Sequence, residues 1–120
     1  MVLAIVDDLM FASKIRSAAG QLGIPIAFAR SSAAALDAVR ESAPALVILD
    51  LNNPRTDPLG TVAALKRDPS TMAIRTVGYA SHVQTDVIDA ARQAGVDEVM
   101  ARSAFTARLG EILSSARPEK

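Results

Sequence analysis

The segment that most constrains the fold is a short apolar run at residues 45–49, which ends in Asp50 and a polar Asn-Asn-Pro turn. A run this short, closed by a turn, predicts a strand buried on both faces rather than a helix. Such strands are typical of parallel sheets covered by helices on each side. Ligands of open sheets of this kind bind beyond the carboxyl ends of the strands, where Asp50 is expected. The alternative is that Asp50 simply begins the turn.

Length and composition limit the class of protein. The chain has 120 residues, half of them hydrophobic, which predicts one domain over residues 1–116 followed by a frayed tail at residues 117–120. Basic and acidic residues number 13 each, so there is no general attraction to nucleic acid or anionic lipid, and neither is expected as a direct partner. Cysteine is absent, and no apolar run approaches the ~18 residues of a membrane span. A cytoplasmic protein is expected.

Apolar runs alternate with segments of helical spacing along the whole chain. Strands are expected at residues 2–6, 26–29, 45–50, 74–80 and 96–101, and helices at residues 9–22, 32–42, 58–67, 83–94 and 103–113. Helix starts are indicated by Ser31 or Ser32, by Asp57 before Pro58, and by Ser103. Five β-α units with short connections predict right-handed crossovers and a parallel sheet with helices on both faces.

Three carboxylates are expected at the carboxyl ends of two strands, Asp7 and Asp8 after the first and Asp50 after the third. These strands can be neighbours in a doubly wound sheet. Converging acids repel, which raises the pKa of at least one of them unless a cation joins them, and Mg²⁺ prefers such oxygen ligands. The alternative is that Asp7 and Asp8 cap the first helix, whose dipole favours acidic residues.

Other residue types favour no competing site. His82 is the only histidine, and with no cysteine beside it, a solvent-facing loop residue is expected rather than a metal ligand. No glycine-rich turn follows the first strand, which argues against a flavin or dinucleotide enzyme.

Residues 6–8, 48–54 and 94–97 together resemble the receiver domain of bacterial response regulators, and the resemblance extends from residue 2 to about residue 113. It implies an α/β fold of the flavodoxin-like type, a doubly wound (βα)5 three-layer sandwich with parallel strand order 2-1-3-4-5. It also implies that Asp50 accepts a phosphoryl group. The implied cofactor is Mg²⁺, with ligands from Asp7, Asp8, Asp50 and the backbone carbonyl of Asn52.

The chain departs from the family at the end of the fifth strand, where receivers carry a lysine followed by a cis proline. Here Arg102 takes the place of the lysine, and Ser103 follows it. Arginine keeps the charge but spreads it over a planar fork, so the replacement is not conservative. We expect its guanidinium to contact Asp50 and to occupy the oxygens needed for attack on phosphorus.

The residues that respond to phosphate in the family are also altered. Receivers carry Ser or Thr at the end of the fourth strand, but Ala80 stands there and Ser81 follows it. Ser81 is the candidate substitute, provided that Gly78 permits a bulge or that the strand ends early, because a shift of one residue turns a side chain to the other face of a strand. Val99 or Met100 stands where receivers carry an aromatic residue.

These features predict a stand-alone receiver-like domain in phosphorelay signal transduction, not an enzyme. Its expected partners are a sensor kinase or phosphotransfer protein and a downstream protein target, and its expected state is a monomer or weak homodimer. One alternative is a pseudo-receiver that serves as a phosphorylation-independent interaction module. A small-molecule-binding or enzymatic flavodoxin-like domain is a further alternative, disfavoured by the missing glycine-rich loop.

Overall fold

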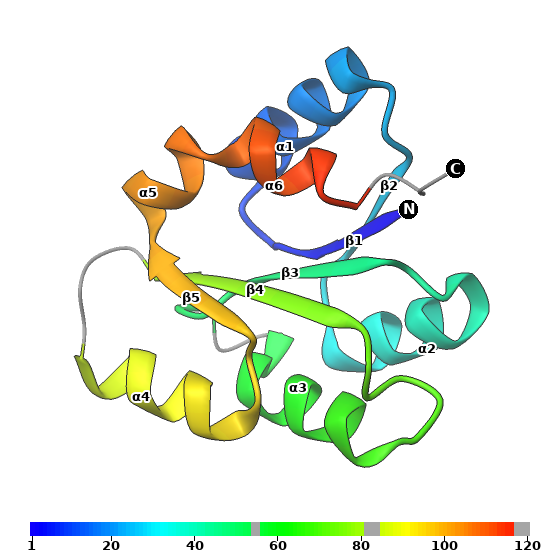
Figure 1. The fold of residues 1–120 in the computed structure, drawn as a ribbon, viewed down its shortest axis with the longest axis vertical. Coiled ribbons are helices and arrows are strands. Elements are labelled where there is room, and N and C mark those ends of the chain that lie inside the picture. Colours follow the sequence, from blue (N-terminus) through cyan, green and yellow to red (C-terminus); the bar gives the residue numbers. More distant parts are fainter. Residues whose placement is uncertain (54–55, 81–84, 117–120) are drawn as a thin grey trace.

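Five parallel strands form one sheet in the order β2-β1-β3-β4-β5, in a computed structural model that describes residues 1–53, 56–80 and 85–116 (Figure 1). The elements in chain order are β1 (Val2–Ile5), α1 (Leu9–Leu22), β2 (Ile26–Ala29), α2 (Ser32–Ser42), β3 (Leu46–Asp50), α3 (Pro58–Arg67), β4 (Arg75–Ala80), α4 (Thr85–Ala94), β5 (Glu98–Ala101), α5 (Arg102–Ala107) and α6 (Leu109–Ser114). The predicted α/β class and strand order are confirmed. The expected tail at residues 117–120 lies outside the described residues.

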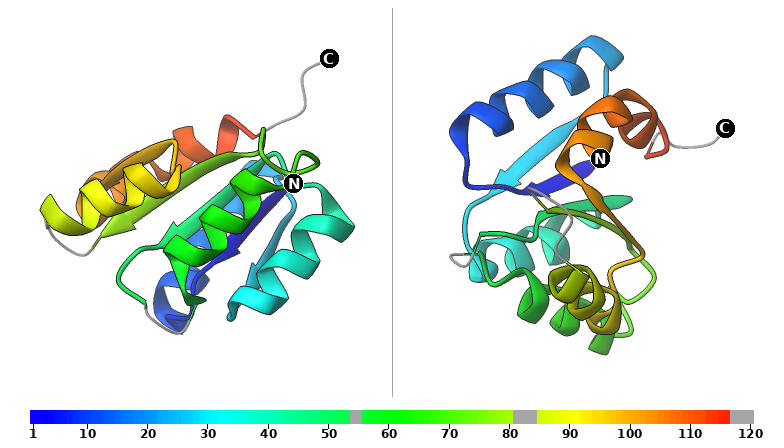
Figure 2. Two further views of the ribbon diagram at one scale, coloured as in Figure 1. Left: turned by 90° about the horizontal axis from the view of Figure 1, so that it is seen from below. Right: turned by 90° about the vertical axis from the view of Figure 1, so that its left-hand side faces the viewer.

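The helices cover both faces of the sheet. Helices α1, α5 and α6 lie on one face, and α2, α3 and α4 lie on the other (Figures 1 and 2). Alternate residues of β1 enter the two cores, Val2 and Ala4 on the α1 side and Leu3 and Ile5 on the α2 side. All four are completely buried. The apolar runs of the central strands follow from this burial on two faces.

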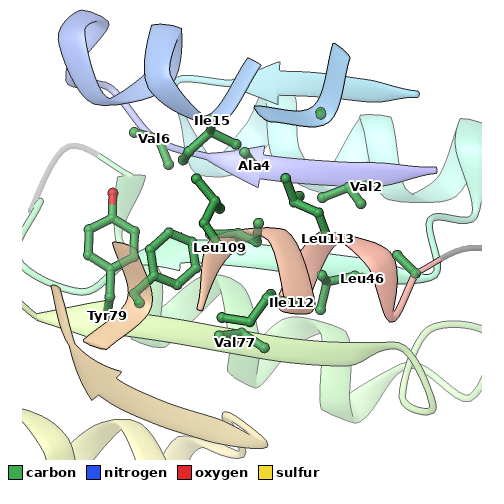
Figure 3. Packing of buried hydrophobic residues seen from close by; sticks show 14 of the residues in the cluster. Val2, Ala4, Val6, Ile15, Leu46, Val77, Tyr79, Leu109, Ile112 and Leu113 are labelled. Carbon is green, nitrogen blue, oxygen red and sulfur yellow. The ribbon is translucent and has the colours of Figure 1, made fainter. Parts of the chain in front are cut away.

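The core on the α1 side contains the largest side chains of α5 and α6. Phe105, Leu109, Ile112 and Leu113 belong to this core, and Figure 3 labels the last three of them. The final helical segment is nevertheless not continuous, because it breaks at Arg108, where φ is −101° and ψ is 9°. Within the described ranges, no helix has the length and apolar character needed to cross a membrane.

Helix starts were predicted well except for the last. The side chain of Ser31 accepts a hydrogen bond from the N–H of Ala34 at the start of α2, and Asp57 caps α3 with Pro58 in its first turn. The predicted cap by Ser103 is wrong. Strand β5 continues directly into α5, which leaves Ala101 at the cap position with no side-chain hydrogen bond.

Gly78 allows a close approach between β4 and the segment that follows β3. A Cβ atom at position 78 would lie only 2.9 Å from Leu51 Cδ1. The N–H of Leu51 donates to the carbonyl of Tyr79 at 2.9 Å, so the chain beyond Asp50 stays against β4. Strand β4 stays in regular register to Ala80, which pairs with Ala101, so the bulge considered there does not form.

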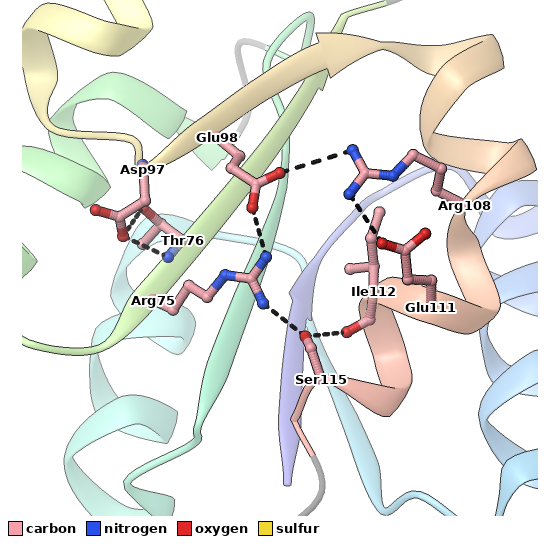
Figure 4. Close-up of polar contacts among 8 residues, drawn as sticks. All are labelled: Arg75, Thr76, Asp97, Glu98, Arg108, Glu111, Ile112 and Ser115. Atoms are coloured by element: carbon pink, nitrogen blue, oxygen red, sulfur yellow. Dashed lines mark hydrogen bonds and ion pairs between the residues drawn. The ribbon is translucent and has the colours of Figure 1, made fainter.

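A partly exposed polar network joins the amino-terminal ends of β4 and β5. Asp97 Oδ2 accepts hydrogen bonds from the N–H of Thr76 at 2.8 Å and from its hydroxyl at 3.1 Å (Figure 4). Lys66 Nζ donates to the same oxygen at 3.3 Å. Burial alone would raise the pKa of Asp97, but these hydrogen bonds and the charge of Lys66 outweigh it and lower the pKa. The ionised carboxylate therefore stabilises this end of the sheet.

The substitution Asp97→Asn should lower the free energy of unfolding by about 1 kcal/mol at pH 7, because charged hydrogen bonds are lost at a partly exposed site. The pKa of Asp97 is lowered on folding, so its contribution is complete above the unfolded value of about 3.9 and disappears as pH falls through the folded pKa. Denaturant unfolding of parent and variant between pH 7 and pH 3 should show the two converging. Asp89→Asn, an exposed control on α4, should leave stability unchanged.

Candidate functional site

The carboxyl ends of β1 and β3 lie side by side, which brings the predicted acidic residues to one edge of the sheet. Ile5 of β1 pairs with Leu49 of β3 in parallel register. Asp50 follows as the last residue of β3, while Asp7 and Asp8 lie just beyond β1. The neighbouring position of these two strands, inferred from the doubly wound pattern, is therefore confirmed.

Asp50 is partly buried and held by the turn that follows it. Its Oδ1 accepts a hydrogen bond from the N–H of Asn52 at 3.0 Å. Burial raises the pKa of Asp50, and the charge of Asp8 raises it further, while the Asn52 N–H and the charge of Arg102 lower it. Burial is the largest of these effects, so the carboxylate is destabilised mainly by loss of water rather than by repulsion among the acids.

Asp8 caps α1 and faces the site at once. Its Oδ1 accepts hydrogen bonds from the N–H groups of Met10 at 3.0 Å and Phe11 at 3.2 Å, and its Oδ2 accepts one from Arg102 at 3.2 Å. The bond from Phe11, followed by that from Arg102, holds the pKa of Asp8 below its usual value. The two alternatives left open for Asp8 are thus not exclusive, since one oxygen caps the helix and the other pairs with a cation.

Asp7 forms an ion pair that the sequence did not indicate. Arg30, directly after β2, donates through Nε to Asp7 Oδ1 at 2.7 Å. The Asp7 side chain is only 14% exposed, whereas that of Arg30 is 62% exposed. The cation therefore reaches in from solvent to neutralise a shielded acid. Because β2 lies beside β1, a basic residue directly after β2, such as Arg30, is the sequence signal that could have indicated a partner for Asp7.

Arg102 points its hydrogen bond at Asp8, not at Asp50. Its guanidinium carbon also lies 4.2 Å from the centre of the Phe11 ring, a cation–π contact. In the described part of the chain, no hydrogen bond joins Arg102 to Asp50, so the expected contact is wrong. The reason is that Asp8, at the start of α1, offers the outward-facing oxygen and Phe11 the stacking surface. Asp8, Phe11 and Arg102 line an open pocket of ≈ 240 Å³ together with Met10 and Lys14.

An aromatic cluster lies beneath the acids. The Tyr79 ring centre is 5.0 Å from that of Phe11 and 4.8 Å from that of Phe105, so α1, β4 and α5 meet there. Within the described residues, the buried Tyr79 hydroxyl has no hydrogen-bond partner. Burial, followed by the charge of Asp50, raises the pKa of Tyr79, so the hydroxyl keeps its proton.

The residues proposed to respond to phosphate are only partly described. Ala80 is completely buried at the end of β4 and carries no hydroxyl. Ser81 and His82 lie outside the described residues, so their assignments remain predictions. Val99 and Met100 of β5 are partly buried. The aromatic side chain next to the site therefore comes from β4, through Tyr79, rather than from β5.

The acids are not arranged as a metal site. Over residues 1–53, 56–80 and 85–116, no group of three or more acidic, histidine or cysteine side chains is placed to hold a metal ion. The oxygen donors are of the type that Mg²⁺ prefers, but Asp7 and Asp8 are each bonded to an arginine. The residues present therefore do not fit the ion in this arrangement. The ligand set of Asp7, Asp8, Asp50 and the Asn52 carbonyl stays a prediction.

The substitution Asp50→Asn should raise the melting midpoint at pH 7 in the presence of a chelator. The pKa of Asp50 is raised in the folded state, so folding loses stability as pH rises through that pKa, and the ionised group destabilises at neutral pH. The gain should be up to about 1 kcal/mol, because partial exposure screens the effect, and it should shrink below about pH 4. Asp57→Asn, a helix cap that Asn can replace, is the control. A lower or unchanged melting midpoint for Asp50→Asn would contradict the conclusion that the ionised Asp50 carboxylate destabilises the fold.

Comparisons with known proteins agree with this geometry. The response regulator from Hahella chejuensis has 23% identity and a TM-score of 0.84 over 94% of this chain and 91% of that chain. Response regulator CheY4 of Vibrio cholerae has 15% identity and a TM-score of 0.83 over 97% of each chain. The Mn²⁺-bound form of response regulator Rcp1 has 19% identity and a TM-score of 0.80 over 99% of this chain and 96% of that chain.

Identities this low establish the shared fold alone, and no curated protein sequence matches the chain significantly. The family model described as "Response regulator receiver domain" matches residues 2–114, which is nearly the whole chain. The match includes both strand ends that carry the acids. The protein therefore belongs to the response regulator receiver domain family.

Proposed function

We propose that this receiver domain accepts a phosphoryl group on Asp50 and acts through protein partners in phosphorelay signalling. The observation that carries the proposal is the position of Asp50, partly buried at the carboxyl end of the central strand, with one oxygen fixed by the Asn52 N–H. A carboxylate in this setting is oriented and partly stripped of water. Both properties favour nucleophilic attack on phosphorus.

The second oxygen of Asp50 is the nucleophile in this proposal. Asp50 Oδ1 is occupied by the Asn52 N–H, and no hydrogen bond to Oδ2 is found in the described ranges. Oδ2 would form a bond to phosphorus while the bond from phosphorus to the donor's leaving group breaks, and the leaving group takes that electron pair. The charge of Arg102 acts on Asp50 across space and would also act on the incoming phosphoryl group.

The implied Mg²⁺ cofactor remains part of the proposal only on one condition. Asp7 and Asp8 must leave Arg30 and Arg102 before their oxygens are available together. No step of the transfer described above depends on the ion.

The response to phosphorylation should be muted. Ala80 supplies no hydroxyl to follow the phosphate, and β4 is in regular register up to that residue. Arg102 is already held by Asp8 and by the Phe11 ring. A phosphoryl group on Asp50 would therefore have few groups to draw inward.

One observation favours a second candidate, the pseudo-receiver that binds partners without phosphorylation. Two arginines already neutralise Asp7 and Asp8 beside Asp50, so these two acids are charge-paired without a metal or a phosphate. Both candidates predict partners that are proteins. For the phosphorylated receiver, the partners are a sensor kinase or phosphotransfer protein and a downstream target. The domain would act in the cytoplasm as a monomer or weak homodimer, without enzymatic activity of its own.

Intact mass after incubation with a small phosphodonor and Mg²⁺ separates the two candidates. The parent protein should slowly gain one phosphoryl group, and the Asp50→Asn variant should gain none. Asp57→Asn is the matched control, because it removes a carboxylate from the neighbouring helix start, and it should be labelled like the parent. Absence of labelling in the parent, or equal labelling of Asp50→Asn, would favour the pseudo-receiver.

The substitution Arg102→Lys should raise the initial rate of phosphorylation severalfold. A lysine ammonium cannot hold Asp8 through a planar fork while stacking on Phe11, so it is freer to meet the phosphoryl group. Adding Ala80→Thr should also increase the change in amide exchange of β4 on phosphorylation. Melting curves of each variant control for folding, because Ala80 is completely buried. Fast labelling of the parent with broad exchange changes would contradict this account.

A further inference from the structure

Each acid that follows β1 is bonded to an arginine from a distant part of the chain. Arg30 reaches Asp7 from the end of β2 at 2.7 Å, and Arg102 reaches Asp8 from the start of α5 at 3.2 Å. Two positive charges thus match the two negative charges beside Asp50. In the part of the chain that the structure describes, Asp50 itself has no arginine bonded to it.

These contacts use the oxygens that a cation would need. Asp8 Oδ1 accepts two backbone N–H groups and Oδ2 accepts Arg102, which leaves this carboxylate little capacity for another partner. Asp7 Oδ1 accepts Arg30 in a shielded position, where the charge pair is stronger than at an open surface. A divalent cation entering between the acids would also meet two guanidinium groups of like charge.

We infer that Arg30 and Arg102 are internal counter-ions that hold this site in a metal-free, ion-paired state, so that a divalent cation binds only in competition with them. The inference deepens the proposed function, on which it rests for the identity of the acidic site. Its physical basis is mutual exclusion, because the same oxygens cannot hold the arginines and a hard cation at full strength.

The two arginines should not contribute equally. The Arg30 side chain is 62% exposed and is held through a single Nε contact, so it can leave into solvent. Arg102 is 38% exposed and is anchored by the Phe11 ring, and its charge acts on both Asp8 and Asp50. Removing Arg102 should therefore free the site more than removing Arg30.

Calorimetric titration of the full chain with Mg²⁺, without any phosphodonor, tests the inference. Arg30→Gln should bind Mg²⁺ about threefold more tightly than the parent, and Arg102→Gln about tenfold more tightly. The matched control is Arg40→Gln, which removes an arginine paired with Asp37 at 3.9 Å at the end of α2. It should leave the affinity unchanged.

A second substitution shows whether the gain passes through the acids. Asp8→Asn retains a residue that caps helices while removing the charge, and adding it to Arg102→Gln should abolish the gain. A gain below about twofold in both arginine variants, or a gain that persists with Asp8→Asn, would overturn the inference. Melting curves in chelator verify that each variant folds. Because Arg30 is exposed, the Arg30→Gln variant still tests the inference if the Arg102→Gln variant fails to fold. Since no phosphate is involved, tighter Mg²⁺ binding can be observed in a domain that never becomes phosphorylated.

Discussion

The convergence of three carboxylates at adjoining strand ends is the constraint on which the rest of the site depends. Parallel pairing of β1 with β3 brings Asp7 and Asp8 beside Asp50, and no rearrangement of side chains can remove them from that edge. The protein meets this constraint in three ways. One acid caps a helix, two acids pair with arginines, and the third is partly buried with a backbone N–H on one oxygen.

Arg102 connects this charge balance to the packing of the core. It bonds to Asp8 and stacks on Phe11, whose ring contacts both Tyr79 and Phe105. A change in charge at the acids can therefore reach α1, β4 and α5 through direct contacts. This connection runs through the start of α5 and the face of α1. It does not use a hydroxyl at position 80, where the chain has alanine, or an aromatic residue of β5.

The fold could be predicted because its signals are local. Alternating periods, capping residues and the apolar run before Asp50 each depend on neighbouring residues, and they predicted the parallel sheet and the edge that carries the acids. The strand order came from the resemblance to receiver domains. The partners of the acids could not be predicted in this way. Arg30 lies 23 residues from Asp7, and Arg102 lies 94 residues from Asp8, so these pairs exist only once the sheet has formed. The break at Arg108 was also missed, and in the folded chain that residue forms ion pairs with Glu98 and Glu111.

The absence of a side chain at Gly78 leaves room for Leu51, the residue that follows the candidate phosphoacceptor Asp50. Leu51 lies over this glycine and is the residue immediately after Asp50, so a larger residue at position 78 would force the Leu51 side chain to move. Among related chains, a larger residue at position 78 should therefore occur only with a smaller residue at position 51. The two positions form a steric pair, which evolution would have to change together in order to keep the residue after Asp50 packed against β4.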